Sequence, residues 1–235
     1  MTLVRRLLFL AACSCLAPTL AAQVGVAPAD SPYGEIRPGT TFEGFGGTLM
    51  GNGGPLHAGP RSGPVMGIRA LLRANSTVSL GFGMWGGLTK RTVIDPTARV
   101  AEREVSEVDH QLIGAEALFQ FNLTGGKTYR GFAPFAALGL GIAKATTTND
   151  EFGYEFGTKF YFAPAVGTRI FLGERMYLRA EARGFAWKLK YPSSWTLEPT
   201  DEPGTPEAPN AVNPTGRSGQ YVVAPTLMFG FGLAF

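Results

Sequence analysis

The stretch Pro225–Phe235 reads PTLMFGFGLAF, and it decides the class of fold. A strand of a soluble protein places polar residues on the side away from its core. Here one face carries large apolar side chains and the other carries small ones, so the bulky face suits lipid. The alternation, with an aromatic residue at position 235, is typical of the last strand of a transmembrane β-barrel. The bulky face holds Pro225, Leu227, Phe229, Phe231, Leu233 and Phe235, and the small face holds Thr226, Met228, Gly230, Gly232 and Ala234.

The same two-residue alternation recurs along the chain and predicts eight strands of ten or more residues, long enough to cross a bilayer when tilted. The connections alternate between long and short, as in a barrel with long outer loops and short periplasmic turns. The sequence therefore predicts an all-β fold, an eight-stranded antiparallel up-and-down transmembrane β-barrel. The expected strands are 41–50, 63–74, 77–88, 108–123, 131–144, 158–172, 176–188 and 219–235.

Three prolines fall inside expected strands, where a missing N–H counts against regular pairing. They are Pro134, Pro164 and Pro225. We interpret them as bulges or as small errors in the expected strand limits.

The N-terminus has the pattern of an export signal, with Arg5 and Arg6 before a short apolar run and then small residues. Cleavage is expected after Ala21 or Ala22. The expected organisation is a signal peptide at 1–22, a periplasmic lead-in at 23–40 and an outer-membrane barrel at 41–235. The expected location is the outer membrane of a Gram-negative-type cell.

Both cysteines, Cys13 and Cys15, lie in the expected signal, so the mature chain would have no disulfide and no thiolate site. The segment ending at Cys13 also reads as a lipobox, and lipidation there is the alternative to ordinary cleavage. Without Arg5 and Arg6, 19 of the 21 basic residues remain against 18 acidic ones. Such a nearly neutral chain gives no argument for nucleic-acid binding.

Polar and charged residues recur on the inward faces of the expected strands. Because an isolated charge in a narrow barrel is costly, these groups are expected to pair with one another and fill the lumen. The alternative is a narrow, porin-like channel for small solutes, with a preference for anions from the excess of arginine. The expected network consists of Arg69, Arg73, Glu116, Gln120, Arg169, Arg179, Glu181 and Arg183.

Aromatic residues near the strand ends predict two belts at the membrane interfaces. We expect one belt at the loop-proximal ends and another at the turn-proximal ends. The first comprises Trp85, Trp187, Tyr191 and Trp195, and the second comprises Tyr129, Tyr177 and Phe235. Carbohydrate stacking on Trp195, in the long Pro-rich last connection, is an alternative use of that residue.

One combination could support lipid hydrolysis, which needs a nucleophile, a histidine and an acid close together. It is His110 with Ser106 and either Glu107 or Glu116. A rim histidine in contact with water is the competing interpretation. We expect no enzyme activity, no metal and no cofactor.

The chain resembles the small outer-membrane β-barrel proteins of the OmpA/OmpX type over residues 40–235. The resemblance rests on the eight-strand rhythm, on the terminal LMFGFGLAF and on the paired segment YFAPAVGTRIFLGERMYLRAEARGFAW. It implies a monomer that contacts outer-membrane lipid and lipopolysaccharide. It also implies insertion by the outer-membrane assembly machinery, which reads the last strand through Tyr221, Val223, Leu227, Phe229, Phe231, Leu233 and Phe235.

The expected function is therefore a structural or surface-interaction role in the outer membrane. The narrow channel and the barrel-borne lipid-modifying enzyme remain as alternatives. A soluble, ligand-holding barrel of the lipocalin type would need the apolar faces to point inward.

Overall fold

The structure, a computed structural model, describes residues 31–36, 39–95, 98, 102–146, 152, 154–196 and 218–235. The expected signal peptide and most of the long last connection lie outside these residues, as does the lead-in up to position 30. No helix within the described ranges is both long and apolar enough to cross a membrane.

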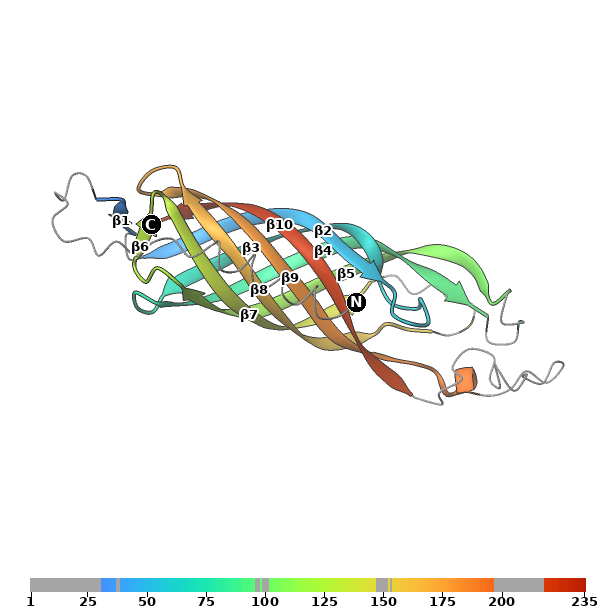
Figure 1. Cartoon of the computed structure of the whole chain (residues 1–235). Helices are drawn as coiled ribbons and strands as arrows, with labels where there is room; N and C mark the ends of the chain where they lie inside the picture. The colour runs from blue at the N-terminus through green and yellow to red at the C-terminus, as the bar shows by residue number, and fades with distance from the viewer. Residues whose placement is uncertain are drawn as a thin grey trace, which may run out of the picture. The chain divides into compact units, whose positions relative to one another are not determined.

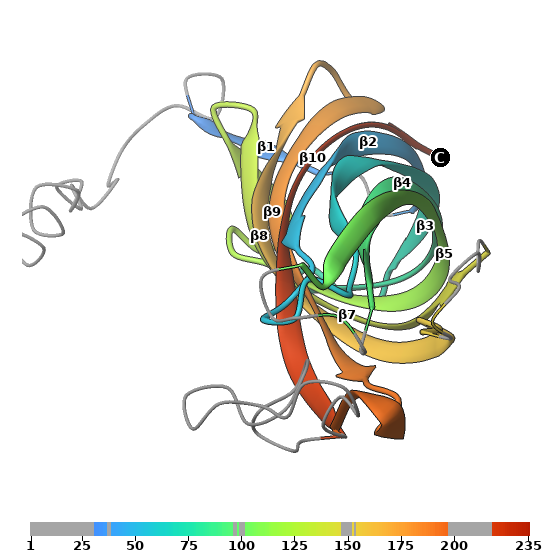
Figure 2. The same ribbon diagram turned by 90° about the vertical axis from the view of Figure 1, so that its right-hand side faces the viewer.

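Eight long strands of the described chain form a closed antiparallel barrel, in which successive strands pair and the last strand pairs with the first (Figure 1). Figure 2 shows the strands curving around a common axis. The predicted fold class is confirmed. The strands are β2 (Thr40–Asn52), β3 (Arg61–Arg73), β4 (Val78–Ile94), β5 (Glu104–Asn122), β7 (Phe132–Ala145), β8 (Thr158–Phe171), β9 (Met176–Lys190) and β10 (Gly219–Ala234).

The hairpin β4–β5 extends further beyond the apolar region than its sequence predicts. Its polar ends were expected to be loop, but the ladder continues through pairs such as Lys90↔Asp109 and Thr92↔Glu107. Polar outward residues are compatible with strand pairing where water replaces lipid, so polarity marks the end of the apolar band here and not the end of the strand.

Part of the expected lead-in also forms a strand. β1 (Tyr33–Glu35) pairs antiparallel with β6 (Lys127–Tyr129), a short strand that follows β5 and precedes β7 in the chain. This small ribbon lies at the end of the barrel that carries the short turns and the C-terminus (Figure 1). Arg73 Nη1 donates a hydrogen bond of 2.6 Å to the carbonyl of Ile36 and connects the segment to the barrel.

The three strand prolines do not produce bulges. Pro134 lies just past the last β5–β7 pair, Asn122↔Phe135, so its missing N–H removes nothing from that ladder. Pro225 pairs with Gly184 of β9 in an uninterrupted register. Pro164 pairs regularly with β7 but lies where two pairs are missing between β8 and β9. The ladder therefore loses bonds locally and keeps its register.

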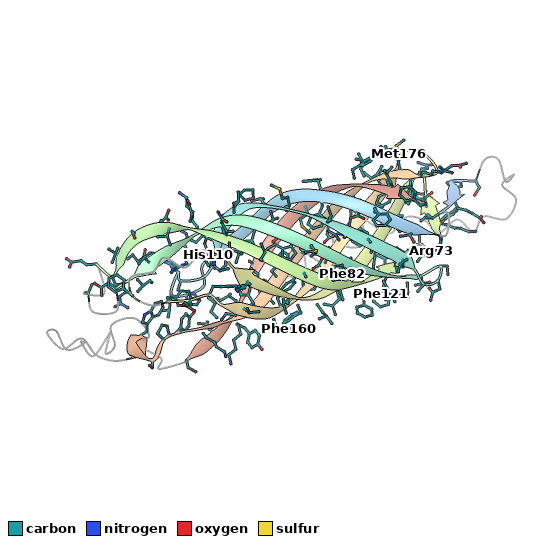
Figure 3. All side chains as sticks on the ribbon, turned by 180° about the vertical axis from the view of Figure 1, so that it is seen from behind. Arg73, Phe82, His110, Phe121, Phe160 and Met176 are labelled. Carbon is teal, nitrogen blue, oxygen red and sulfur yellow. The ribbon has the colours of Figure 1, made fainter. Side chains whose placement is uncertain are left out.

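The outward face of the barrel is apolar. Phe82, Phe121 and Phe160 point away from the ribbon in Figure 3. Ile68 and Phe229 each expose about two thirds of their surface, at 67% and 68%. Because water would disfavour so continuous an apolar surface, the barrel spans a membrane. The inverted, ligand-holding soluble barrel is excluded, because the inward face is the charged one.

Candidate functional site

Charged side chains from five strands meet inside the barrel, with Glu181 of β9 at their centre. The carboxylate of Glu181 accepts hydrogen bonds from Arg69 Nη1 at 3.1 Å, Arg179 Nε at 2.7 Å and Arg183 Nε at 2.6 Å. Arg179, Glu181 and Arg183 alternate along β9, so all three point into the lumen. All four side chains are at most 1% exposed.

Two further carboxylates complete the ion-pair layer. Glu116 of β5 accepts two bonds from Arg183 Nη1, at 2.9 and 2.8 Å, and one from the Tyr161 hydroxyl at 3.2 Å. Glu43 of β2 accepts a bond of 2.9 Å from the Tyr177 hydroxyl. It also pairs with two arginines of the Glu181 cluster, at 3.3 and 3.4 Å. These two buried carboxylates thus have both charged and neutral polar partners, which offsets the cost of burying them.

The other expected network members divide into two groups. Gln120 Oε1 accepts a 2.6 Å bond from Arg179, and Arg169 Nη2 donates a 2.8 Å bond to Asn122 Oδ1. Arg73 does not join them. Its Nε bonds to the carbonyl of Asn75, so both of its partners are backbone groups at the turn end.

Four members of the layer were not part of the network expected from the sequence. They are Glu43, Asn122, Tyr161 and Tyr177. Glu43 was missed because glycines at 44, 46 and 47 blur the two faces of its strand. Tyr177 was expected in an interface belt, although it shares the odd-numbered parity of Arg179 and Glu181, which indicates an inward position.

A second, aromatic layer fills the lumen on the loop side of the charged layer. Trp85 donates a 2.8 Å bond to the Tyr161 hydroxyl, and its ring lies 4.9 Å from that of Phe185. Trp187 stacks on Phe185 with 5.9 Å between ring centres. The belt expected at the loop-proximal ends is therefore wrong. Its four members are buried inside the barrel: Trp85, Trp187, Tyr191 and Trp195.

Trp195 completes the aromatic layer on its loop side. A short 3-10 helix, η2 (Ser193–Thr196), follows β9 and turns Trp195 inward between Tyr154 and Tyr191. The Trp195 ring stacks on both, at 5.3 and 5.7 Å. Burial raises the pKa of Tyr191 above its usual value. Because Trp195 is fully buried, it has no free face for a carbohydrate.

The connection between β2 and β3 also folds over the lumen. Ala58 is 1% exposed, and Leu56 packs against the aromatic layer. Gly53 and Gly54 have φ of 75° and 76°, in the left-handed region, which lets this tight turn point inward. The Gly54 backbone lies so close to Val222 of β10 that an added Cβ would come within 2.8 Å of it.

Large lumen rings pack directly on glycines of the neighbouring strand. In each case the two residues are paired in the ladder, and an added Cβ on the glycine would lie 2.2–2.7 Å from the ring. The glycine therefore provides the space that the ring occupies. The pairs are Phe45↔Gly67, Trp85↔Gly114, Phe135↔Gly167, Tyr161↔Gly141 and Tyr177↔Gly232.

The residues considered for lipid hydrolysis are not assembled. His110 is inward and buried against Phe156, and neither of its ring nitrogens has a hydrogen-bond partner in the described part of the protein. Ser106 is exposed, and Glu107 pairs with Arg61 on the surface. Glu116 is held by Arg183 and Tyr161, as described above. Within the same residues, no group of three potential ligands could hold a metal ion.

No protein-family model matches the sequence, and no curated protein is significantly similar to it. Among solved structures, the outer membrane protein OprG from Pseudomonas aeruginosa gives a TM-score of 0.49 at 13% identity, over 88% of this chain and 99% of OprG. Neisserial surface protein A gives 0.47 at 15% identity, over 87% and 98%. The N-terminal β-barrel domain of Pseudomonas aeruginosa OprF gives 0.46 at 12% identity, over 84% and 98%.

The fold and the lumen of the chain itself define its class. It is a transmembrane β-barrel of the small, eight-stranded kind that its sequence resembles, with charged and aromatic layers stacked inside it.

Proposed function

We propose that the protein is an integral outer-membrane barrel that seals its own lumen and serves a structural or surface-interaction role. The observation that carries the proposal is that two layers, one charged and one aromatic, fill the lumen. A solute would have to displace both the ion pairs around Glu181 and the aromatic layer above them. Separating a buried ion pair costs several kcal/mol per ion, by general estimate. The proposed role is therefore not that of an open channel. We propose no enzyme activity, because the residues considered for lipid hydrolysis lie apart.

A polar hollow at the loop end supports the surface-interaction part of the proposal. It has a volume of about 430 Å³ and lies between the ends of β2, β3, β4 and β5. Its wall combines the Arg61–Glu107 ion pair with Lys90, and His57 lies beside Glu104 at 2.8 Å. Such a rim of donors and acceptors could hydrogen-bond a polar partner outside the membrane.

The location and assembly follow from the same proposal. The apolar band would lie in the outer membrane, in contact with its lipids and lipopolysaccharide, with the protein present as a monomer. The outward face of β10 would be read by the assembly machinery.

Conductance in planar bilayers tests the sealed lumen. The refolded protein is added to a solvent-free bilayer in concentrated KCl, with a wide porin as the positive control. We expect no current steps that scale with protein concentration. Reproducible steps with anion selectivity would contradict the proposal and favour the channel alternative. In that case Glu181→Gln should alter the selectivity, because the residue lies at the centre of the charged layer.

A further inference from the structure

The outer wall of the barrel changes from apolar side chains to lysines at the loop ends of two strands. On β7 the outward series passes from Ile142 to Lys144, and on β9 the even-numbered, outward series ends with Lys188 and Lys190. All three lysines are exposed. They therefore lie at the level where the hydrocarbon of the leaflet gives way to its headgroups.

The register brings these lysines together on one side of the barrel. Lys144 pairs with Thr158 of β8. The paired part of the β8–β9 ladder reaches Tyr161↔Trp187 at this end, so Lys188 directly follows the last paired residue of β9. Neighbouring strands are about 4.8 Å apart, so Lys144 of β7 and Lys188 of β9 lie two strands apart, which is on the order of 10 Å across β8. Figure 3 shows Phe160 pointing outward from this sector.

The three lysines lack carboxylate partners among the described residues. The described contact of Lys188 is with the ring of Tyr221, 6.0 Å away on β10. Lys90, at the same end of the barrel, differs because an acidic residue, Asp109, lies opposite it in the backbone ladder. Among the described residues, the lysines of β7 and β9 thus form a positive patch without paired acids, which we call the lysine sector.

An apolar hollow lies beside the lysine sector. It has a volume of about 550 Å³ and extends across the outer faces of β3, β4, β5 and β7. Gly86 and Ala115 have small or absent side chains there, while Ile113 and Ile142 are large, and Lys144 and Thr158 line its edge toward β8. An added Cβ on Gly86 would make only an ordinary contact, so none of the described side chains fills the space above it.

We infer that the lysine sector and this hollow together bind a phosphate-bearing lipid of the leaflet at the loop end. The phosphate contacts Lys144 and Lys188 and an acyl chain lies in the hollow. A phosphate oxygen accepts hydrogen bonds from ammonium groups, and an acyl chain matches the apolar lining. The inference rests on the proposed placement in a membrane and adds a specific lipid site to it.

Spin-labelled lipids test the site in bilayers of phosphatidylcholine that contain the refolded barrel. The fraction of motionally restricted label gives the association of phosphatidic acid relative to phosphatidylcholine. We expect the wild type to prefer phosphatidic acid. The double variant Lys144→Gln/Lys188→Gln should reduce that preference on the order of fivefold or more, because each basic group near an anionic headgroup contributes about that factor. Lys90→Gln is the matched control and should behave as the wild type.

Two additional measurements keep the test decisive. Ala115→Phe should fill the hollow and lower the preference while leaving every charge in place. Salt at about 0.5 M should weaken the wild-type preference and hardly affect the double variant, because screening acts on the lysine–phosphate attraction. Arginines at the turn end, such as Arg130, are present in all variants. Their contribution to the lipid preference is therefore the same in each and cancels in the comparison.

Equal preference in the wild type and in the folded double variant would overturn the inference. Folding of each variant is verified by circular dichroism in the same bilayers. That outcome would leave the sealed lumen untouched, since the conductance measurement does not depend on these lysines. A conducting wild type that retains the lysine-dependent preference would conversely contradict only the proposed function.

Discussion

Glu181 binds three arginines at once, and no other carboxylate of the described lumen does so. Its neighbour Arg179 also pairs with Glu43, and its neighbour Arg183 also pairs with Glu116. Glu181 therefore connects the other two buried carboxylates through these arginines. Two rings add to the layer, because the Arg179 guanidinium lies 3.8 Å from the centre of the Phe135 ring and that of Arg69 lies 4.4 Å from Phe45.

Replacement of this acid should be costly. Glu181→Ala leaves buried arginines without their common partner, and we expect a loss of about 3–5 kcal/mol in the free energy of unfolding. Urea unfolding of the barrel in lipid vesicles, followed by tryptophan fluorescence, measures the change. Glu155→Ala, at an exposed acid outside the strands, is the matched control and should change little. Unfolding midpoints that coincide for the two variants would show that Glu181 does not hold the layer together.

The aromatic–glycine pairs give a second prediction at the scale of single residues. Gly232→Ala places a Cβ within 2.2 Å of the Tyr177 ring, so the ring must move and strain its bond to Glu43. We expect a destabilisation of about 1–3 kcal/mol, as for overpacked cores.

Gly44→Ala is the matched control for that substitution. It lies on an adjacent strand, and an added Cβ there meets no atom within 4 Å. The same urea titration compares the two. If both substitutions have equal effects, backbone freedom and not ring packing explains the glycine in the lumen.

At the scale of elements, the periodicity of β9 predicts much of the site. Its odd-numbered positions from Tyr177 to Leu189 all face inward, and this parity was sufficient to predict Arg179, Glu181 and Arg183 as lumen residues. β2 gives no such signal, because its glycines leave both faces without a clear character. Glu43 points inward because β2 pairs with both β3 and β10. This pairing exists only in the closed barrel and cannot be read from the sequence of β2.

The aromatic layer shows a different limit of prediction from the sequence. Trp187 was assigned to an interface belt because tryptophan near a strand end is common there. The parity of β9 places it inward, and that signal was in the sequence. Trp195 has no such signal, because it lies beyond the strand and its inward position depends on η2 packing against Tyr154 and Tyr191.

The last strand supports a prediction about assembly. Phe235 is 74% exposed at the turn end of the barrel, where it contributes little to internal packing. If the assembly machinery reads this strand, Phe235→Ala should lower the amount of folded protein in cell membranes severalfold, with little effect on refolding in detergent. Phe82→Ala, at another exposed phenylalanine of the outer wall, is the control. Equal losses in cells and in detergent would point to stability instead of recognition.

At the scale of the whole molecule, the closed ladder should make the native state visible on a gel. We expect a barrel without free edges to resist dodecyl sulfate at room temperature, because removing any one strand breaks two ladders at once. We expect the unboiled protein from isolated membranes to migrate faster than the boiled protein. Identical mobility, with the protein in the soluble fraction, would contradict a membrane barrel.

The aromatic–glycine pairs also have a consequence for strand alignment. All five lie in the hairpins joined by the long connections: β2–β3, β4–β5, β7–β8 and β9–β10. A short turn fixes the alignment of its strands by its length, whereas a long loop allows slippage. A slip of two residues would set Trp85 against Leu112 or Glu116 instead of Gly114. Each ring thus fits only one register of its hairpin. The long outer loops can therefore change in length without shifting the register of the strands that they join.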